Sequence, residues 1–305
     1  MKRSVFPLLI ALLALAVSCK KEDKPQWSLP GYEINFESVT AQTLKLADLK
    51  ATAVVPEDAV SGVVFGFKFS KTRDFLEEKT LVKKFSNLSP GVNELAWTAY
   101  DISGYDPYYC CAFYSLGGDE HCTDVVEYYP GAVDLGLSVD WAITNCGGTA
   151  PSSEGNSYSW GAIVANQTPY SMSGYTYTTD SATLPLKDDA ANYWWGKGWR
   201  YPTKAEMEEL LENCTKEWTT VSSYKGLKLN SKKKPGASIF LPMAGGYSGS
   251  DYIERNQTGY YWTSTRIETS EDTKAYILHF YNETAEISDN YFGYFGFAIR
   301  PVRKR

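Results

Sequence analysis

The sequence predicts a mostly β, α+β protein, with an antiparallel β-sandwich in its N-terminal part and an α+β unit with one main amphipathic helix in its C-terminal part. Short apolar runs alternate with a period of two, which is typical of half-buried strands. The chain has 24 Gly and 14 Pro among 305 residues, so turn residues separate these runs frequently. One stretch, beginning at Thr203, repeats apolar residues at the spacing of a helix.

The first residues predict a secretory signal peptide. A short positive segment, Met1–Arg3, precedes an apolar run over residues 5–17, and Cys19 follows one small residue later. The end of the run resembles a bacterial lipobox. The resemblance implies a signal peptide at 1–18, lipidation of Cys19 and a lipidated tether at 19–30. An ordinary signal peptide with a coincidental cysteine is the alternative.

The residues after this cysteine carry a second signal. Lys21 is followed by Glu22 and Asp23. A lysine before two acidic residues resembles the surface-export signal of Bacteroidetes lipoproteins. The resemblance implies that acyl chains hold the protein in the outer membrane, with the folded part at the cell surface. A generic solvated tether is the alternative.

Residues 31–129 predict the β-sandwich. In the run from Val63 to Phe69, alternate residues share one face, as in a half-buried strand. Further strands are expected at 93–100, 108–114 and 121–128, with turns at 88–91 and 117–118. The Leu-Ser-Pro-Gly turn that ends at Gly91 and the tyrosine-rich run from Tyr108 resemble bacterial fibronectin type III-like modules. That resemblance implies a spacer.

Residues 130–305 predict the α+β unit. Thr203 and Glu206 have the spacing of a capping box at the start of a helix. The apolar stripe of this helix consists of Met207, Leu210, Leu211 and Cys214. Strands are expected at 238–241, 259–265, 274–281 and 295–302. Both faces of the third strand are apolar or aromatic, so we expect it to lie in the centre of a sheet.

Several short blocks occur in order along the second module: Asp134–Ala142, Tyr158–Gly161, Trp199–Glu206, Ser238–Gly245, Tyr261–Thr265, Ala275–Tyr276 and Arg300–Val302. This ordered set resembles the Fibrobacter succinogenes major paralogous domain. The resemblance implies a C-type lectin-like fold with long irregular loops and brings no catalytic site. The sequence lacks the Glu-Pro-Asn and Trp-Asn-Asp calcium motifs of animal C-type lectins, so no metal is expected. Arg200 and Arg300 are expected to hold loops by bridging backbone carbonyls.

Five cysteines follow the lipidated one. Cys110, Cys111 and Cys122 lie on the two arms of one hairpin, where a 110–122 bridge, a 111–122 bridge or buried thiols are the alternatives. Cys146 and Cys214 of the second module are candidates for another bridge. Members of the family place a cysteine slightly earlier than Cys146, which counts against that bridge.

The candidate ligand-binding surface lies in loops of the second module. These loops combine tyrosines, which offer a large contact area with few rotatable bonds, with directional polar groups. The candidates are Tyr247, Asp251, Tyr252, Glu254, Arg255, Asp289, Asn290, Tyr291, Tyr294 and, in an aromatic cluster, Trp194. Such a mixture suits a glycan or a protein epitope. The alternative is that these are solvated loops whose tyrosines pack locally.

Composition excludes several classes of function. With only two histidines, a zinc hydrolase built on several of them is nearly excluded. The net charge of -6 argues against a nucleic-acid partner. The sequence has no Gly-rich phosphate loop, so no cofactor is expected. We therefore expect a non-catalytic binding or adhesion lipoprotein. The alternatives are an accessory component of a fimbrial or polysaccharide-uptake assembly, and a glycoside hydrolase.

Overall fold

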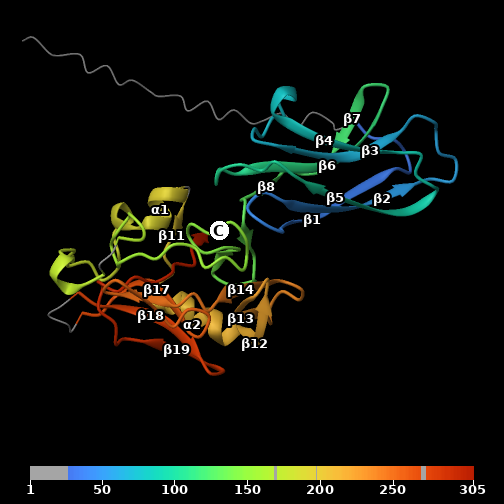
Figure 1. Cartoon of the computed structure of the whole chain (residues 1–305). Helices are drawn as coiled ribbons and strands as arrows, with labels where there is room; N and C mark the ends of the chain where they lie inside the picture. The colour runs from blue at the N-terminus through green and yellow to red at the C-terminus, as the bar shows by residue number, and fades with distance from the viewer. Residues whose placement is uncertain (1–26, 168–169, 197, 269–272) are drawn as a thin grey trace, which may run out of the picture.

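The computed structural model of the chain describes residues 27–167, 170–196, 198–268 and 273–305 (Figure 1). The predicted signal peptide, the predicted lipidation site Cys19 and most of the predicted tether lie outside the described residues. Trp27 and Leu29, the described residues at the end of the predicted tether, pack against the core of the first module. No helix in the described part of the chain has the length and hydrophobicity needed to cross a membrane.

The first module consists of two antiparallel sheets packed face to face. One sheet has the strand order β1-β2-β5, and the other has the order β4-β3-β6-β7, with β8 also paired to β6. The elements are β1 (Glu33–Ala41), β2 (Ala47–Val55), β3 (Val64–Ser70), the 3-10 turn η1 (Glu77–Lys79), β4 (Thr80–Ser86), β5 (Gly91–Ala99), β6 (Tyr108–Leu116), β7 (Asp119–Cys122) and β8 (Val126–Tyr128).

Strand β3 shows how the sequence pattern produces the sandwich. Phe65, Phe67 and Phe69 are all buried in the core between the two sheets, as their alternation predicts. Between them, a Cβ atom at Gly66 would lie 2.2 Å from the carbonyl oxygen of Lys83 on β4, so only glycine fits there. The predicted mostly β fold class is confirmed.

The described residues of the second module form four small sheets and two α-helices. The strand orders are β11-β20-β10-β9, β12-β13-β14, β15-β16 and β17-β18-β19. The elements are β9 (Ala132–Val133), β10 (Val139–Ala142), η2 (Met172–Gly174), η3 (Leu186–Asp188), α1 (Ala190–Trp195), β11 (Trp199–Arg200), α2 (Lys204–Asn213), β12 (Cys214–Val221), β13 (Tyr224–Ser231), β14 (Ser238–Pro242), β15 (Gly246–Ser248), β16 (Asp251–Ile253), β17 (Gly259–Arg266), β18 (Ala275–Tyr281), β19 (Thr284–Ser288) and β20 (Val302–Lys304).

Helix α2 begins as the sequence predicts. The Thr203 side chain accepts from the amide of Glu206, and the Glu206 carboxylate accepts from the amide of Thr203, which completes the capping box. Met207 and Leu210 are fully buried in the core of the module. The apolar stripe therefore faces the core.

Strand β18 lies between β17 and β19, so the predicted central strand at 274–281 is confirmed. The strand expected at 295–302 is wrong for most of its length. Residues 296, 297 and 298 form isolated bridges with three different segments, at Tyr247, Tyr158 and Tyr261. Because the chain changes partner at each residue, a regular strand forms only at β20.

Arg300 has the structural role expected of it. Its side chain is fully buried, and the guanidinium donates to the backbone carbonyls of Ala142, Ile143 and Phe240 and to the side chain of Asn145. These acceptors belong to segments far apart in the sequence. The side chain therefore ties the C-terminal segment to the start and the middle of the module.

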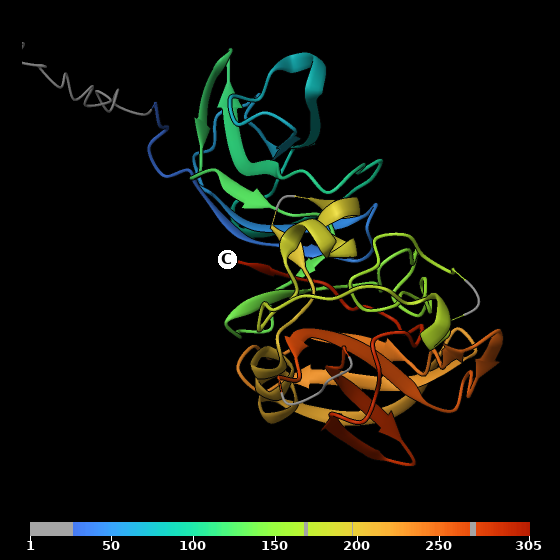
Figure 2. The same cartoon turned by 90° about the vertical axis from the view of Figure 1, so that its left-hand side faces the viewer.

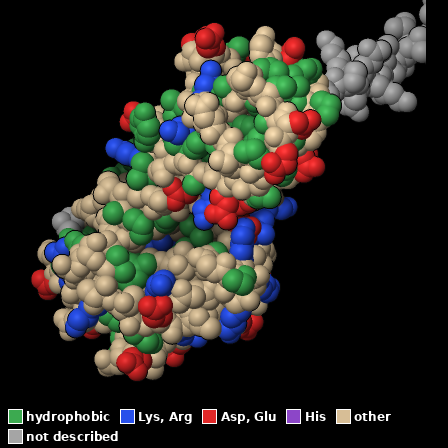
Figure 3. All heavy atoms as spheres, turned by 90° about the vertical axis from the view of Figure 1, so that its right-hand side faces the viewer, with side chains coloured by type: hydrophobic (Ala, Val, Ile, Leu, Met, Phe, Trp, Pro, Cys, Tyr) green, Lys and Arg blue, Asp and Glu red, His purple; other side chains and the backbone are tan. Residues whose placement is uncertain are grey.

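The two modules meet along one side of the sandwich. Tyr105, between β5 and β6, stacks on Trp195 at the end of α1, and α1 lies on the side of the second module that faces the sandwich (Figure 2). Arg303 lies over the ring of Tyr129, 3.2 Å from its centroid, and pairs with Asp140. Acidic and basic side chains gather where the two lobes meet (Figure 3). The junction therefore combines the stacking of Tyr105 on Trp195 with the contact of Arg303 with the Tyr129 ring, while the Arg303–Asp140 ion pair lies within the second module.

The cysteines correct one expectation. Cys146 and Cys214 are both buried free thiols, and they belong to different core clusters, so the bridge considered for them is absent. Cys110 and Cys111 are also buried thiols, on β6. Cys122 on β7 is in side-chain contact with Cys111.

Candidate binding site

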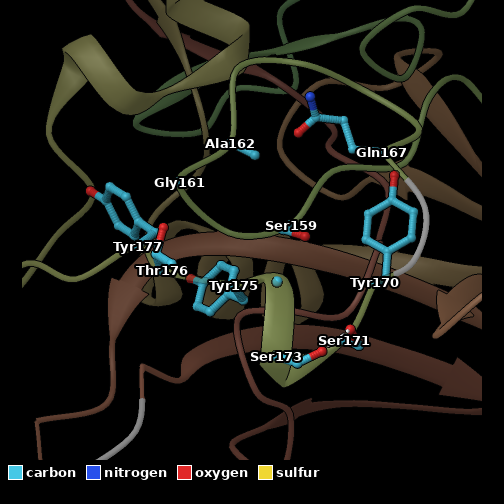
Figure 4. A pocket seen from close by; sticks show the side chains of 11 residues that line it. Ser159, Gly161, Ala162, Gln167, Tyr170, Ser171, Ser173, Tyr175, Thr176 and Tyr177 are labelled. Atoms are coloured by element: carbon cyan, nitrogen blue, oxygen red, sulfur yellow. Dashed lines mark hydrogen bonds between the residues drawn. The ribbon is translucent and has the colours of Figure 1, made fainter.

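Described residues between Ser159 and Tyr177 line an open pocket of about 430 Å³, here called the 159–177 pocket. Its lining residues are Ser159, Gly161, Ala162, Gln167, Tyr170, Ser171, Ser173, Gly174, Tyr175, Thr176 and Tyr177. Tyr170 lies on one side of it, Tyr175 and Tyr177 lie on the other, and Ser159 lies between them (Figure 4). This volume is in the range of cavities that hold small ligands.

The tyrosine rings of the pocket are held in place by their own hydroxyls. The hydroxyl of Tyr170 donates to the Ser157 carbonyl and that of Tyr175 donates to the Trp160 carbonyl, each at 2.8 Å. Burial raises the pKa of Tyr170 to about 12, so this phenol is neutral at physiological pH. The rings therefore present fixed, uncharged faces.

Other polar groups of the pocket are open to a ligand. Gln167 and Thr176 are exposed, and their side chains make no hydrogen bond to another described residue. The hydroxyls of Ser171 and Ser173 lie 3.2 Å apart, and either can donate to the other. None of the described lining residues carries a charge. The chemistry of this pocket suits a neutral ligand with several hydroxyl groups.

Three of the predicted loop residues join this pocket through stacked rings. Tyr247 lies between Tyr170, at a centroid distance of 5.2 Å, and Tyr252, at 4.6 Å and nearly parallel. Arg255 lies over the ring of Tyr252 and pairs with Glu154 at 2.7 Å. The row of rings thus runs from the pocket wall to the surface, where Tyr252 is 37% exposed.

The remaining predicted residues take other positions. Glu254 accepts from the hydroxyl of Tyr260, and this hydrogen bond lowers the pKa of the Glu254 carboxyl. Tyr291 packs edge-on against Tyr260 and is half-buried, which makes it part of the core rather than an open contact. Tyr294 stacks on Phe295, and its carbonyl accepts from Ser159 of the pocket.

Some predicted residues are exposed and lie away from the pocket lining. These are Asp251, Asp289 and Asn290. Trp194 is 57% exposed on α1 and does not line the 159–177 pocket. The structure therefore divides the predicted candidates among several places. No group of three His, Cys, Asp or Glu side chains among the described residues could hold a metal ion.

The pocket itself is absent from the sequence predictions. One signal for it exists: from Tyr170 to Asp180, eight of eleven residues carry a hydroxyl group, and two of those, Ser171 and Ser173, lie close to Gly174. Such a run is typical of a loop, and periodicity does not indicate that a loop closes on itself to form a cavity. The loop is held around the pocket by the hydrogen bonds of the Tyr170 and Tyr175 hydroxyls to the carbonyls of Ser157 and Trp160, which the sequence does not indicate.

Comparisons with known proteins add little to this geometry. A scan against known protein families finds no match, and a search of curated proteins finds none either. Among solved structures, the chain is similar to the sensor domain of the anti-sigma factor RsgI4 from Pseudobacteroides cellulosolvens. The similarity covers 33% of this chain and 96% of the other, with 14% identity and a TM-score of 0.27. A likeness this weak carries no argument about function.

Proposed function

We propose that the protein is a surface-anchored, non-catalytic binding lipoprotein whose second module, a C-type lectin-like domain, takes a neutral glycan in the 159–177 pocket. In this proposal Cys19 carries the acyl chains in the outer membrane, and the fibronectin-like first module is the spacer. The observation that carries the proposal is the lining of the pocket, which combines hydroxyls and an amide with tyrosine rings and has no charge among its described residues.

A sugar ring matches this lining in two ways. Its hydroxyls both donate and accept hydrogen bonds, as do the side chains of Ser173, Thr176 and Gln167. Its C–H face is apolar and packs on an aromatic ring such as Tyr175. The stacked rings of Tyr247 and Tyr252 extend the same kind of surface outward, so a chain of several sugars has further contacts beyond the pocket.

A binding role is preferred to a hydrolytic one because of the carboxylates. A glycosidase needs two carboxyl groups that flank the scissile bond. None of the described residues that line the pocket is Asp or Glu. One carboxylate, that of Asp188, contacts a lining residue: it accepts a hydrogen bond from the hydroxyl of Tyr177 at 3.0 Å.

Glycan-array binding of the full chain in detergent micelles, followed by titration of the glycans that bind, tests the proposal. We expect Gln167→Ala and Thr176→Val each to weaken binding roughly three- to tenfold, the effect of losing one neutral hydrogen bond. Both side chains are exposed, so the fold should be unchanged by thermal shift. Binding should be the same with calcium and with a chelator.

Asn290→Ala is the matched control, since Asn290 is an exposed amide of the second module outside the pocket lining. If Asn290→Ala weakened binding and Gln167→Ala did not, the ligand would bind at the 288–294 loop. That result would contradict the assignment of the 159–177 pocket as the binding site. If the folded protein bound no glycan on the array, the proposal that the ligand is a glycan would be contradicted.

A further inference from the structure

A second cavity lies at the junction of the two modules. It has a volume of about 350 Å³ and is here called the junction cavity. Its lining residues are Tyr105, Cys146, Gly147, Asn156, Tyr158, Ala165, Trp194 and Trp195. Tyr105 comes from the β-sandwich, and all the others come from the second module. The cavity shares no lining residue with the 159–177 pocket.

The aromatic walls of the junction cavity are fixed. The rings of Tyr105 and Trp195 stack at a centroid distance of 4.4 Å with an angle of 11° between their planes. Trp195 also packs against the fully buried Trp199, with the two rings nearly perpendicular. Burial raises the pKa of Tyr105 to about 12, so its phenol is neutral. The wall is therefore rigid and uncharged.

Trp194 forms an open part of the lining. Its side chain is 57% exposed, which is unusual for a tryptophan. Its indole N–H nevertheless donates to the carbonyl of Ile163 at 2.7 Å, which fixes the ring. The Tyr193 ring packs against the indole at a centroid distance of 5.1 Å in an edge-to-face arrangement. Because the only donor of the indole is already paired, its exposed part offers ring surface on which another ring can stack.

The polar groups of the junction cavity are few. The hydroxyl of Tyr158 contacts the Cys146 thiol at 3.5 Å, and burial raises the pKa of that thiol to about 12. Among the described lining side chains, Asn156 carries the amide, and none is charged. A sugar would leave most of its hydroxyls unpaired here, which costs free energy. A flat aromatic ring would not.

We propose that the junction cavity binds a planar aromatic ligand with one hydrogen-bonding group, of the phenol or indole class, which stacks on Trp194 and contacts Tyr105. Such a ligand touches both modules at once. The ligand therefore binds more tightly when Tyr105 lies on Trp195 than when the two modules are apart. Its binding stabilises the junction by this difference in affinity.

Indole and p-cresol are the probes for this site, measured by saturation-transfer NMR and calorimetric titration on the full chain in detergent. We expect both to bind, and we expect Trp194→Ala and Tyr105→Ala each to weaken binding roughly five- to tenfold. Tyr105→Phe keeps the ring and should keep most of the affinity. Tyr100→Ala is the matched control, because Tyr100 is 58% exposed in the same inter-strand loop region and lies outside the cavity lining.

Three results would overturn the proposal. The first is no binding of either probe to folded protein. The second is binding that Trp194→Ala leaves unchanged. The third is binding that depends on Trp194 but not on Tyr105, which would confine the site to the second module. A glycan that fills the 159–177 pocket should not displace the probes, so failure of one site is distinguishable from failure of the other.

Discussion

Asp189 is the residue on which the position of helix α1 depends. It is almost fully buried, and its two carboxylate oxygens accept from the amides of Asn192 and Tyr201, at 2.9 and 2.7 Å. The first bond caps α1, which carries Trp194 and Trp195. The second joins the start of the helix to the segment after β11. One side chain thus places the tryptophans of the junction cavity.

Burial raises the pKa of Asp189 from 3.8 to about 6, and the amide hydrogen bonds oppose this rise. Because the folded state then holds the proton more tightly than the unfolded state, stability from this group is full below pH 4 and decreases as the pH rises to about 6. In the wild-type protein this fall in the free energy of unfolding is on the order of 3 kcal/mol. We expect it to be absent from the Asp189→Asn variant, which has no carboxyl group to titrate. Urea unfolding of both proteins from pH 4 to 7 measures it. Parallel pH profiles would contradict the assignment.

Helix α2 gives a prediction at the scale of an element. Thr203→Ala removes the side-chain acceptor for the Glu206 amide but leaves the apolar stripe intact. We expect a loss of about 1 kcal/mol, which lowers the melting temperature by roughly 2–4 °C. Thermal unfolding followed by circular dichroism checks it, with the exposed Thr178→Ala as control. If both variants lowered the melting temperature equally, the capping hydrogen bond of Thr203 would not stabilise the protein more than an exposed threonine does.

Elements with a regular period could be predicted from the sequence, and elements defined by tertiary contacts could not. The phenylalanines of β3 and the cap at Thr203 depend on neighbours two to four residues away, so their pattern is local. The segment at 295–302 has the composition of a strand, but residues such as Phe297 bridge a different partner at each position. Tyr170 likewise forms a pocket wall only through its contacts with Ser157 and Tyr247.

For the candidate site, sequence reasoning found part of the surface. The chemistry of Tyr247 and Tyr252 predicts that they belong to a binding surface, and both lie in the row of rings that starts at the pocket. Tyr291 has the same chemistry and packs against Tyr260 instead. Whether a loop tyrosine is open or buried depends on which rings surround it, and that information is not local in the sequence.

At the scale of the whole molecule, the apolar cores separate by module. The buried cluster of the sandwich runs from Tyr32 to Tyr128, and the two clusters of the second module run from Leu135 to Val302. At the junction, Tyr105 of the first module is partly buried and packs against one cluster of the second module. The two modules therefore have the cores that independent cooperative units need.

We expect calorimetry of the full chain to resolve two unfolding transitions. Arg300→Ala should lower only the transition of the second module, by about 3–5 kcal/mol, because it leaves the Asn145 side chain and several buried carbonyls without a donor. Arg73→Ala, on the first module, is the control. A single transition, or two that Arg300→Ala moves together, would show that the junction couples the modules into one unit.

The burial of Arg300 also sets the order in which the chain completes its fold during synthesis. Its acceptors at Ala142 and Phe240 leave the ribosome before Arg300 does. At a translation rate of about 5–20 residues per second, these carbonyls stay without their donor for several seconds. The sandwich can close once Tyr128 has emerged. The second module stays open until its last strand, β20, arrives between β10 and β11. Its folding is therefore completed late, after the sandwich has already been able to close.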